Sequence, residues 1–128
     1  MSQKQWISSG SVFETVAAYS RAVVENGWVH VSGTTGFNYA DMTISNDVVT
    51  QTHQCFATIS TALKQAGCGL NDVVRVRYFL TDASDFNLLA PLFGHYFKVA
   101  RPAATAVVVG LIDPRMKIEI EVTARVFT

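Results

Sequence analysis

Residues Arg101–Phe127, RPAATAVVVGLIDPRMKIEIEVTARVF, lie in the last third of the 128-residue chain and carry its most regular strand pattern. This stretch predicts two strands joined by a turn at Asp113-Pro114. From Lys117 to Val126, polar and apolar residues alternate without interruption, and successive side chains of a strand point to opposite faces. The second strand therefore has one buried face and one face that carries charges of both signs.

Length and composition are those of a globular protein. The chain is 49% hydrophobic and 16% charged, and we expect a single domain over residues 1–128 that buries roughly two-thirds of its unfolded surface. Ten basic and ten acidic residues balance, so no basic stripe points to nucleic acid as a partner. The low charged fraction leaves little polar surface and favours an oligomer over a free monomer.

The N-terminus and the cysteines bear on location and metal content. The first ten residues, MSQKQWISSG, have no apolar signal core, and no run approaches the ~18 apolar residues of a membrane span. Cys55 and Cys68 match neither a metal-ligand spacing nor a disulfide framework, which favours a reducing compartment. We therefore expect a cytoplasmic protein with no metal site and no membrane partner.

Further strands are predicted where β-branched and aromatic residues cluster. They cover Lys4–Ile7, Tyr19–Glu25, Trp28–Thr34 and Asp72–Thr81. A loop of small residues follows Ile7. Asn26-Gly27 is the strongest short hairpin signal, because both of its positions must take positive φ. In the Asp72–Thr81 strand, alternation places Val74 and Val76 on one face and Val73 on the other.

Two helices are predicted between these strands. Their expected bounds are a cap at Ser45 or Asn46 and an end near Ala66 for the first, and a start at Ser84 or Asp85 for the second. Gly67 supplies the stop for the first helix. Pro91 lies inside the second helix, where it removes one backbone hydrogen bond and bends the helix.

Two helices cannot cover both faces of a sheet of five to six strands, so we expect an α+β fold with both helices on one face. That face receives Ile118, Ile120, Val122, Val74 and Val76. The other face carries Arg75, Arg77, Lys117, Glu119 and Glu121 among Val73, Phe79 and Phe127. Isolated buried charges are costly, so paired charges within a subunit interface are the physical solution. The sequence predicts an oligomer with polar clefts between subunits.

Several short blocks along the chain resemble a known family when they are taken together and in order. They are AAYSRAV around Tyr19, Val31–Gly33, Gln51-Thr52, DVVRVRYFL from Asp72, Ser84–Phe86, Pro102-Ala103 and Lys117–Glu121. Each block alone is weak, but the ordered set is specific and spans essentially the whole chain. It is similar to the Rid (reactive intermediate deaminase) family, also called the YjgF family.

This resemblance implies a chorismate-mutase-like fold: a mixed sheet with two helices on one face, assembled as a homotrimer. Sites in the family lie in clefts between adjacent subunits. Enzymatic members hydrolyse enamines and imines formed from amino acids, releasing ammonia and a 2-keto acid without a metal or organic cofactor. The expected partners are thus other copies of this chain and a small-molecule carboxylate or imine-type metabolite. Nucleic acid is the least expected partner.

The resemblance also supplies candidate site residues. Glu119 matches the acid that helps to position water, and Tyr19 matches a residue that closes the cleft, so both are catalytic candidates. The substrate-binding candidates are Ser32, Gly33, Phe86, Ala104, Thr105 and Arg101. Simpler roles stay open for them: Glu119 can pair with a nearby arginine, Tyr19 can be an aromatic at a strand end, and Arg101 can be a solvated loop residue.

The chain departs from the family pattern at two positions. In enzymatic members an arginine directly after the Pro-Ala pair grips the substrate carboxylate, whereas here that position is Ala104. The family also has an asparagine in the second helix, where this chain aligns Ala90. Losing an arginine–carboxylate contact removes about 1.5–3 kcal/mol of binding. The usual 2-iminopropanoate deaminase activity is therefore not expected.

Three functions remain open. If the protein is an enzyme, the resemblance implies a cofactor-independent imine or enamine deaminase-like hydrolase that works through a rebuilt cleft. The alternative is a trimer that binds a metabolite in the same clefts without catalysis. An RNA-directed role, as a ribonuclease or translation inhibitor, is the weakest of the three because the net charge is zero.

Overall fold

The computed structural model describes residues 4–126, and it contains one long mixed sheet with helices against one face. The strand order is β1-β2-β3-β8-β6-β7. The strands are β1 (Gln5–Ile7), β2 (Ala22–Glu25), β3 (Trp28–Thr35), β8 (Ile118–Arg125), β6 (Val73–Leu80) and β7 (Ala103–Val108). All neighbours in the sheet are antiparallel except β6 and β7, which are parallel.

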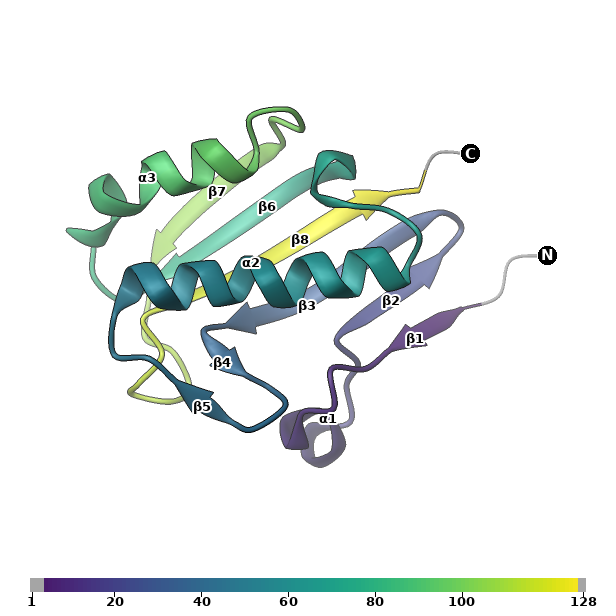
Figure 1. Ribbon diagram of the computed structural model, residues 1–128, viewed down its shortest axis with the longest axis horizontal. Helices are drawn as coiled ribbons and strands as arrows, with labels where there is room; N and C mark the ends of the chain where they lie inside the picture. The colour runs from purple at the N-terminus through teal and green to yellow at the C-terminus, as the bar shows by residue number, and fades with distance from the viewer. Residues whose placement is uncertain (1–3, 127–128) are drawn as a thin grey trace.

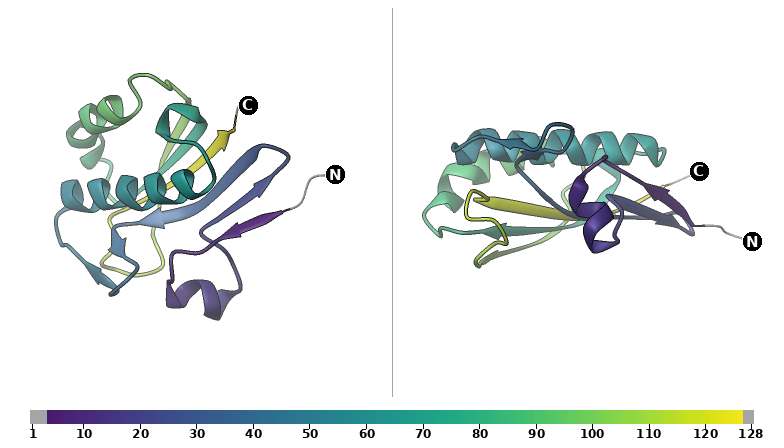
Figure 2. Two further views of the ribbon diagram at one scale, coloured as in Figure 1. Left: turned by 45° about the vertical axis from the view of Figure 1, so that its right-hand side comes forward. Right: turned by 90° about the horizontal axis from the view of Figure 1, so that it is seen from below.

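Two helices cover one face of this sheet, as the sequence predicted. They are α2 (Val48–Gln65) and α3 (Asp85–Tyr96), and both lie on the same side of the strands (Figures 1 and 2). The smaller elements are α1 (Val12–Ala17), the hairpin of β4 (Phe37–Asn38) and β5 (Thr43–Ile44), and a short 3₁₀ helix, η1 (Leu70–Asp72). Seen from the side, no described helix packs across the opposite face (right panel of Figure 2).

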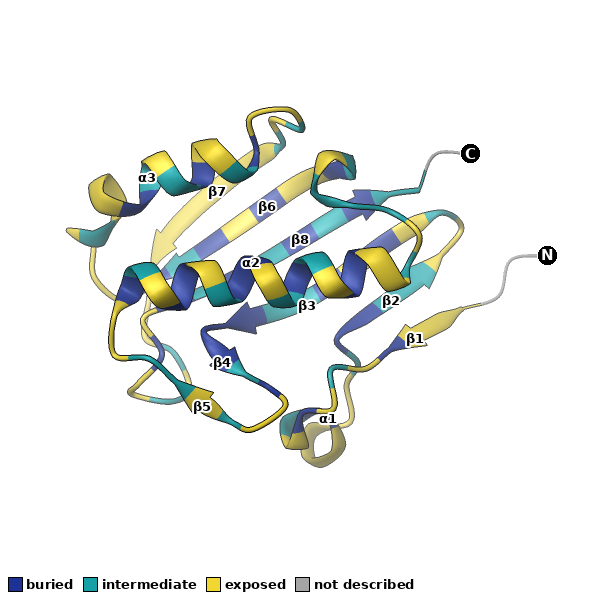
Figure 3. Ribbon diagram, viewed as in Figure 1, coloured by how far each residue is buried: buried dark blue, intermediate teal, exposed yellow. Residues whose placement is uncertain are grey.

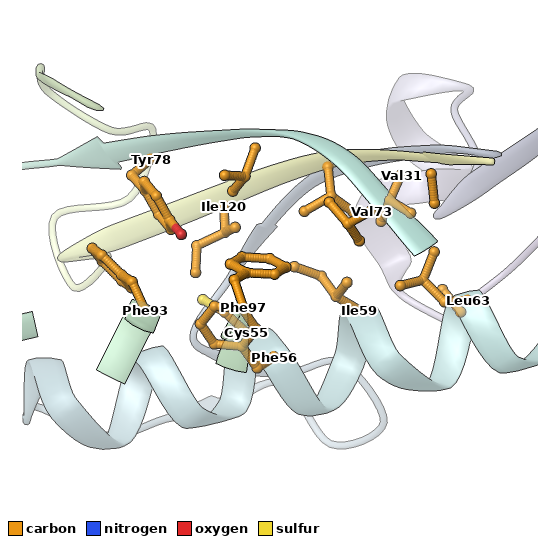
Figure 4. Close-up of a cluster of buried hydrophobic side chains, with 14 of the residues drawn as sticks. Val31, Cys55, Phe56, Ile59, Leu63, Val73, Tyr78, Phe93, Phe97 and Ile120 are labelled. Carbon is orange, nitrogen blue, oxygen red and sulfur yellow. The ribbon is translucent and has the colours of Figure 1, made fainter. Parts of the chain in front are cut away.

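The core lies between the two helices and the strands. The core includes Ile118, Ile120 and Val122 of β8, which are buried as their alternation predicted. Phe56, Ile59 and Leu63 of α2 approach the strands from below in Figure 4, and Phe93 of α3 stacks on Tyr78 of β6 with ring centroids 3.9 Å apart. Each of these side chains loses its apolar surface to neighbours, which is the main stabilising contribution to such a fold.

The two closing strands that the sequence predicted are present, but they are not neighbours in the sheet. β6 lies between β7 and β8, and it pairs with both of them. A parallel pair needs a crossover connection, and α3 supplies it between β6 and β7. The chain then returns through the turn at Asp113-Pro114 to place β8 in the middle of the sheet, between β3 and β6.

The faces assigned to Val73 and Val74 were also wrong. The pairing of β6 with β8 shifts register between Val73 and Arg75, so one extra residue is accommodated there. Such a bulge reverses the alternation on its two sides. Val73 is consequently buried in the core, whereas Val74 is exposed. Phe127, predicted for the other face, lies outside the described residues.

Local capping explains two more differences from the sequence prediction. The cap of α2 is Asp47 rather than Ser45 or Asn46, because its Oδ2 accepts a hydrogen bond from the Thr50 N–H at 2.8 Å. The predicted loop after Ile7 contains α1, which Ser11 caps and Ala18 ends in a left-handed conformation. At six residues, α1 is too short to show a helical period in the sequence.

The other predicted signals are confirmed. Asn26 and Gly27 have φ values of 53° and 79°, as the β2–β3 hairpin requires. Gly67 follows α2 with a φ of 89°. Ser84 precedes α3, which contains Pro91.

The Gln51 side chain ties α2 to the segment that leads into β8. Its Nε2 donates to the carbonyl oxygens of Ser45 at 2.7 Å and Arg115 at 2.9 Å, and its Oε1 accepts from the N–H of Lys117 at 2.9 Å. Gln51 is fully buried, so these bonds satisfy groups that water cannot reach. These hydrogen bonds fix the start of β8 to α2 and so help to set the position of Glu119.

The helix-free face carries paired charges beside apolar residues. Arg77 and Glu121 form an ion pair of 3.1 Å across β6 and β8, and the guanidinium of Arg125 lies 4.8 Å from the centre of the Trp28 ring. Trp6, at the β1 edge, is 67% exposed. The pairing of charges that the sequence predicted for this face is confirmed for Arg77 and Glu121.

Candidate functional site

Glu119 lies on the helix-free side of β8, opposite the buried Ile118 and Ile120. Its neighbours in register are Thr35 of β3 and Phe79 of β6. The carboxyl group rests against Gly33, because a Cβ added there would lie only 2.8 Å from Cδ of Glu119. The pairing of β3 with β8 shifts register between Val31 and Thr34, so this contact lies at a bulge. The structure thus brings together two of the predicted site residues.

The environment of Glu119 raises the affinity of its carboxylate for a proton. Burial raises the pKa of Glu119 above the ordinary glutamate value, the Arg21 guanidinium offsets part of that rise, and the nearby Glu121 carboxylate adds to it. A carboxyl group with a raised pKa can accept and return a proton closer to neutral pH. This property suits a general acid–base group.

Arg21 is a site residue that sequence reasoning missed. Its side chain is only 1% exposed, and its Nη1 donates to the carbonyl oxygen of Gly33 at 2.9 Å and to Oγ1 of Thr34 at 3.0 Å. These bonds hold the bulge against which Glu119 rests. The only signal in the sequence is an arginine two residues after Tyr19, where a strand begins.

The charge of Arg21 is balanced by one buried acid, Glu14. Its Nε lies 3.8 Å from Oε2 of Glu14, which is 7% exposed and also accepts a hydrogen bond from the Ser9 hydroxyl. The guanidinium lies 4.4 Å from the centre of the Tyr39 ring, within range of a cation–π contact. Nε itself has no hydrogen-bond partner among the described residues. Arg21 thus lies among Glu14, Tyr39 and the bulge.

The predicted residues Tyr19 and Ser32 also contact this group. The Tyr19 hydroxyl accepts a long hydrogen bond of 3.4 Å from Nη2 of Arg21, and the ring is 37% exposed. The hydroxyl of Ser32 donates to the carbonyl oxygen of Ser20 at 2.6 Å, and its N–H donates to the carbonyl oxygen of Arg21 at 2.8 Å. Ser32 therefore joins β3 to the segment that contains Tyr19. We call Tyr19, Arg21, Ser32, Gly33 and Glu119 the Glu119 group.

Three other predicted residues lie elsewhere in the chain. Phe86, Arg101 and Ala104 line a hollow of about 470 Å³ between α3 and the strands β6 and β7. Ala104 pairs with the buried Val76, so it faces the helix side, whereas Glu119 faces the opposite side. No residue of the Glu119 group lines this hollow.

Thr105 belongs to neither group. Its Oγ1 accepts a hydrogen bond of 3.4 Å from Nη2 of Arg75, on the helix-free face. The predicted residues therefore lie in three places in one chain. The roles assigned to them stay predictions.

Replacing Gly33 with alanine tests whether the contact with Glu119 matters. The new Cβ would meet Cδ and Oε2 of Glu119 at 2.8 and 2.9 Å, so the carboxyl group has to move. We expect roughly a tenfold loss of any activity that depends on Glu119, because a displacement of this size misorients a reacting group. Gly33 does not have a positive φ, so backbone strain should not contribute.

The measurement for Gly33→Ala is activity together with the midpoint of urea unfolding. Gly69→Ala is the matched control, because a Cβ there meets no atom within 4 Å. If both variants lost activity equally, the contact between Gly33 and Glu119 would have no special role.

Within residues 4–126, no group of three or more His, Cys, Asp or Glu side chains is arranged to hold a metal ion. None of the helices in this range is both long enough and apolar enough to cross a bilayer.

Comparison with known proteins identifies the family. The family described as Endoribonuclease L-PSP matches residues 10–126, nearly the whole chain. The chain therefore belongs to this family, which is also known as the YjgF, Rid or RutC family. The resemblance inferred from the ordered sequence blocks is confirmed.

Relatives and solved structures agree with this assignment. Human 2-iminobutanoate/2-iminopropanoate deaminase is 30% identical over 119 residues, covering 92% of this chain and 87% of the human protein. The crystal structure of Rv2704 from Mycobacterium tuberculosis, a member of the YjgF/YER057c/UK114 family, is 38% identical with a TM-score of 0.88. It covers 97% of this chain and 100% of its own.

A further structure, RidA from the Antarctic bacterium Psychrobacter, is 31% identical with a TM-score of 0.84, and the match covers 94% of this chain and 98% of that one. Together these similarities confirm the predicted chorismate-mutase-like α+β fold.

Proposed function

We propose that this protein hydrolyses an imine or enamine of a small metabolite, in clefts between the subunits of a homotrimer. The observation that carries the proposal is the half-buried Glu119 carboxyl group, held against Gly33 with a raised pKa. The human relative named as a 2-iminobutanoate/2-iminopropanoate deaminase supports the reaction class. The proposed substrate differs from that of this relative, because Ala104 provides no cation.

Two features support assembly. The helix-free face exposes large apolar side chains, including Trp6, Trp28 and Val107, which a second copy of the chain would remove from water. The predicted site residues are also divided between the Glu119 group and the hollow beside Ala104. In a ring of three subunits, one chain can supply Glu119 and its neighbour can supply the hollow, so that each cleft is complete only in the assembly.

In the proposed reaction, the Glu119 carboxylate accepts a proton from a water molecule as the water oxygen bonds to the imine carbon. The carbon–nitrogen double bond becomes single, and the protonated Glu119 gives this proton to the nitrogen, so that a neutral carbinolamine forms. The Glu119 carboxylate then accepts the hydroxyl proton of the carbinolamine and passes it to the nitrogen, as the carbon–nitrogen bond breaks and the carbon–oxygen bond becomes double. The overall change consumes one water and releases ammonia and a carbonyl compound, with Glu119 regenerated.

The direct test supplies imines made in place by an amino-acid oxidase, from amino acids with side chains of many sizes. We expect the protein to accelerate ammonia release from at least one of them above the spontaneous rate. The heat-unfolded protein serves as the control. No acceleration with any imine or enamine in the panel would contradict the proposed activity.

Substituting arginine for Ala104 should move activity toward small iminocarboxylates. Its guanidinium would add a bidentate contact to the carboxylate worth about 1.5–3 kcal/mol, or roughly 10- to 100-fold in kcat/KM. Ala104→Lys is the matched control, since it adds a charge without the planar fork and should give less. If Ala104→Arg assembled correctly and gained nothing with 2-iminopropanoate, more than this contact would separate the protein from such deaminases.

A second function, binding of a metabolite without catalysis, is favoured by the alanines at positions 90 and 104. Both line the hollow beside α3 and supply no side-chain hydrogen bond to orient a reacting group. Ligand binding raises the melting temperature even without turnover. A compound that stabilises the protein but is not hydrolysed, combined with inactivity on the imine panel, would establish this alternative over hydrolysis.

A further inference from the structure

The hollow between α3 and the strands β6 and β7 has an aromatic floor. Its volume is about 470 Å³, compared with about 300 Å³ for the hollow beside Arg21. Buried Tyr78, Phe93 and Phe97 line it, and the Tyr78 and Phe93 rings lie one against the other in Figure 4. Phe86 stands at its edge, 41% exposed, with its ring centroid 6.4 Å from that of Phe93. We call this hollow the aromatic pocket.

Small residues leave the aromatic pocket unfilled. Ala90 and Gly94 of α3 and Ala104 and Ala106 of β7 line it without projecting into it. β7 is exposed along its whole length (Figure 3), so the described chain does not cover this wall. The volume falls within the range of small-molecule sites, roughly 300–1,000 Å³. It exceeds what the methyl group of an alanine-derived substrate would occupy.

Two cationic side chains lie at the rim of the aromatic pocket, and none of the described residues that line it is acidic. Lys98 and Arg101 both line the pocket and are exposed. Neither takes part in the ion pairs found among the described residues. Arg101 has a φ of 45°, which is uncommon for a residue other than glycine, and its N–H donates to the carbonyl oxygen of Phe97 at 2.9 Å. This left-handed conformation keeps Arg101 next to the end of α3.

We propose that the aromatic pocket binds an apolar substrate side chain of about the size of a phenyl ring, and that Lys98 and Arg101 bind the substrate's carboxylate. An apolar body and an anionic head match the aromatic floor and the cationic rim. This inference rests on the proposed hydrolysis for its reaction. It names imines of large apolar amino acids, rather than those of alanine, as the substrate class.

Binding can be measured without turnover, using 2-keto acids that correspond to the products. By isothermal titration calorimetry, phenylpyruvate should bind roughly 10- to 100-fold more tightly than pyruvate, because its ring removes more apolar surface from water. 3-Phenylpropanoate should bind about tenfold or more tightly than 3-phenylpropanamide, which has the same ring but no charge. Equal affinities within either pair would overturn the corresponding half of the proposal.

Variants locate the binding. Ala104→Phe should fill the aromatic pocket and weaken phenylpyruvate binding at least about tenfold. The double variant Lys98→Gln/Arg101→Gln should bind 3-phenylpropanoate no more tightly than 3-phenylpropanamide. Ala57→Phe and Lys64→Gln are the matched controls. Ala57 is exposed on α2 and lines the hollow beside Arg21, and Lys64 is exposed near the end of α2. If Ala57→Phe weakened phenylpyruvate binding and Ala104→Phe left it unchanged, the ligand would lie in the hollow beside Arg21 and the proposal would be overturned.

The two proposals can fail separately. If phenylpyruvate binds in the aromatic pocket but no imine is hydrolysed, the pocket assignment stands and the proposed hydrolysis is wrong. If small imines are hydrolysed while phenylpyruvate binds no better than pyruvate, the reaction stands and the substrate class is wrong.

Discussion

Replacing Glu119 with glutamine is expected to lower kcat/KM for imine hydrolysis by roughly 10²–10⁴-fold, the usual contribution of a positioned acid–base group. Glutamine has nearly the same shape, so it can keep the contact with Gly33. It cannot accept a proton from water and return it to the departing nitrogen. The loss should therefore appear in activity and not in the unfolding midpoint.

The dependence of kcat/KM on pH is a second test of the Glu119→Gln variant. Because burial raises the pKa of Glu119, the fraction of the active carboxylate falls as pH decreases through a midpoint above the ordinary glutamate value. The kcat/KM of the wild-type protein should decrease as the pH falls below this midpoint, whereas the kcat/KM of Glu119→Gln should show no such decrease. Glu25→Gln, an exposed change at the β2–β3 hairpin, is the matched control. A full wild-type rate in Glu119→Gln would remove this residue from the reaction.

Replacing Arg21 with methionine is expected to destabilise the fold by about 3–5 kcal/mol, because it leaves a buried acid without its partner. Glu14 is 7% exposed and lies 3.8 Å from Nε of Arg21. The same change removes the hydrogen bonds from Arg21 to the Gly33 carbonyl and the Thr34 hydroxyl. We expect both effects in the free energy of unfolding from urea titration.

Arg115→Met is the matched control for Arg21. Arg115 forms a closer ion pair with Asp113, at 2.8 Å, but its side chain is 56% exposed. Exposed pairs contribute little, so the control should cost less than about 1 kcal/mol. If both variants lost the same free energy of unfolding, burial of the Arg21–Glu14 pair would make no extra contribution to stability. A restored stability in Arg21→Met with Glu14→Gln would support the explanation by an unpaired acid.

Much of the fold was accessible from the sequence because regular patterns determine it. The alternation through β8 identified its buried face, and Asn26-Gly27 identified the hairpin. The strand order was not accessible, since no local pattern states that β8 enters between β3 and β6. The bulge at Val73 was missed for a related reason: it arises from pairing with β8, whereas alternation within one strand predicts regular faces.

The site was predictable only where a resemblance pointed to it. Glu119 and Gly33 were expected to be site residues, and the structure places them in contact. Arg21 was missed because an arginine at a strand start is ordinarily exposed, and only the tertiary structure buries it against Glu14 and Tyr39. Phe86, Arg101 and Ala104 of the aromatic pocket were expected to be site residues, but its floor of Tyr78, Phe93 and Phe97 was missed because these rings come from β6 and from the end of α3. In a sequence, apolar residues that line an open pocket cannot be told apart from those that fill a core.

We propose that each site combines Glu119 of one chain with the aromatic pocket of another, and mixed assembly of two inactive variants distinguishes such a shared site from a site within one chain. Glu119→Gln and Ala104→Phe are unfolded together in equal amounts, refolded, and assayed for ammonia release with the best imine of the panel. For a shared site, the mixture should recover about one quarter of the wild-type rate, because random assembly pairs an intact Glu119 with an intact pocket at that frequency. A mixture that co-assembles and remains as inactive as the separate variants would contradict the shared site.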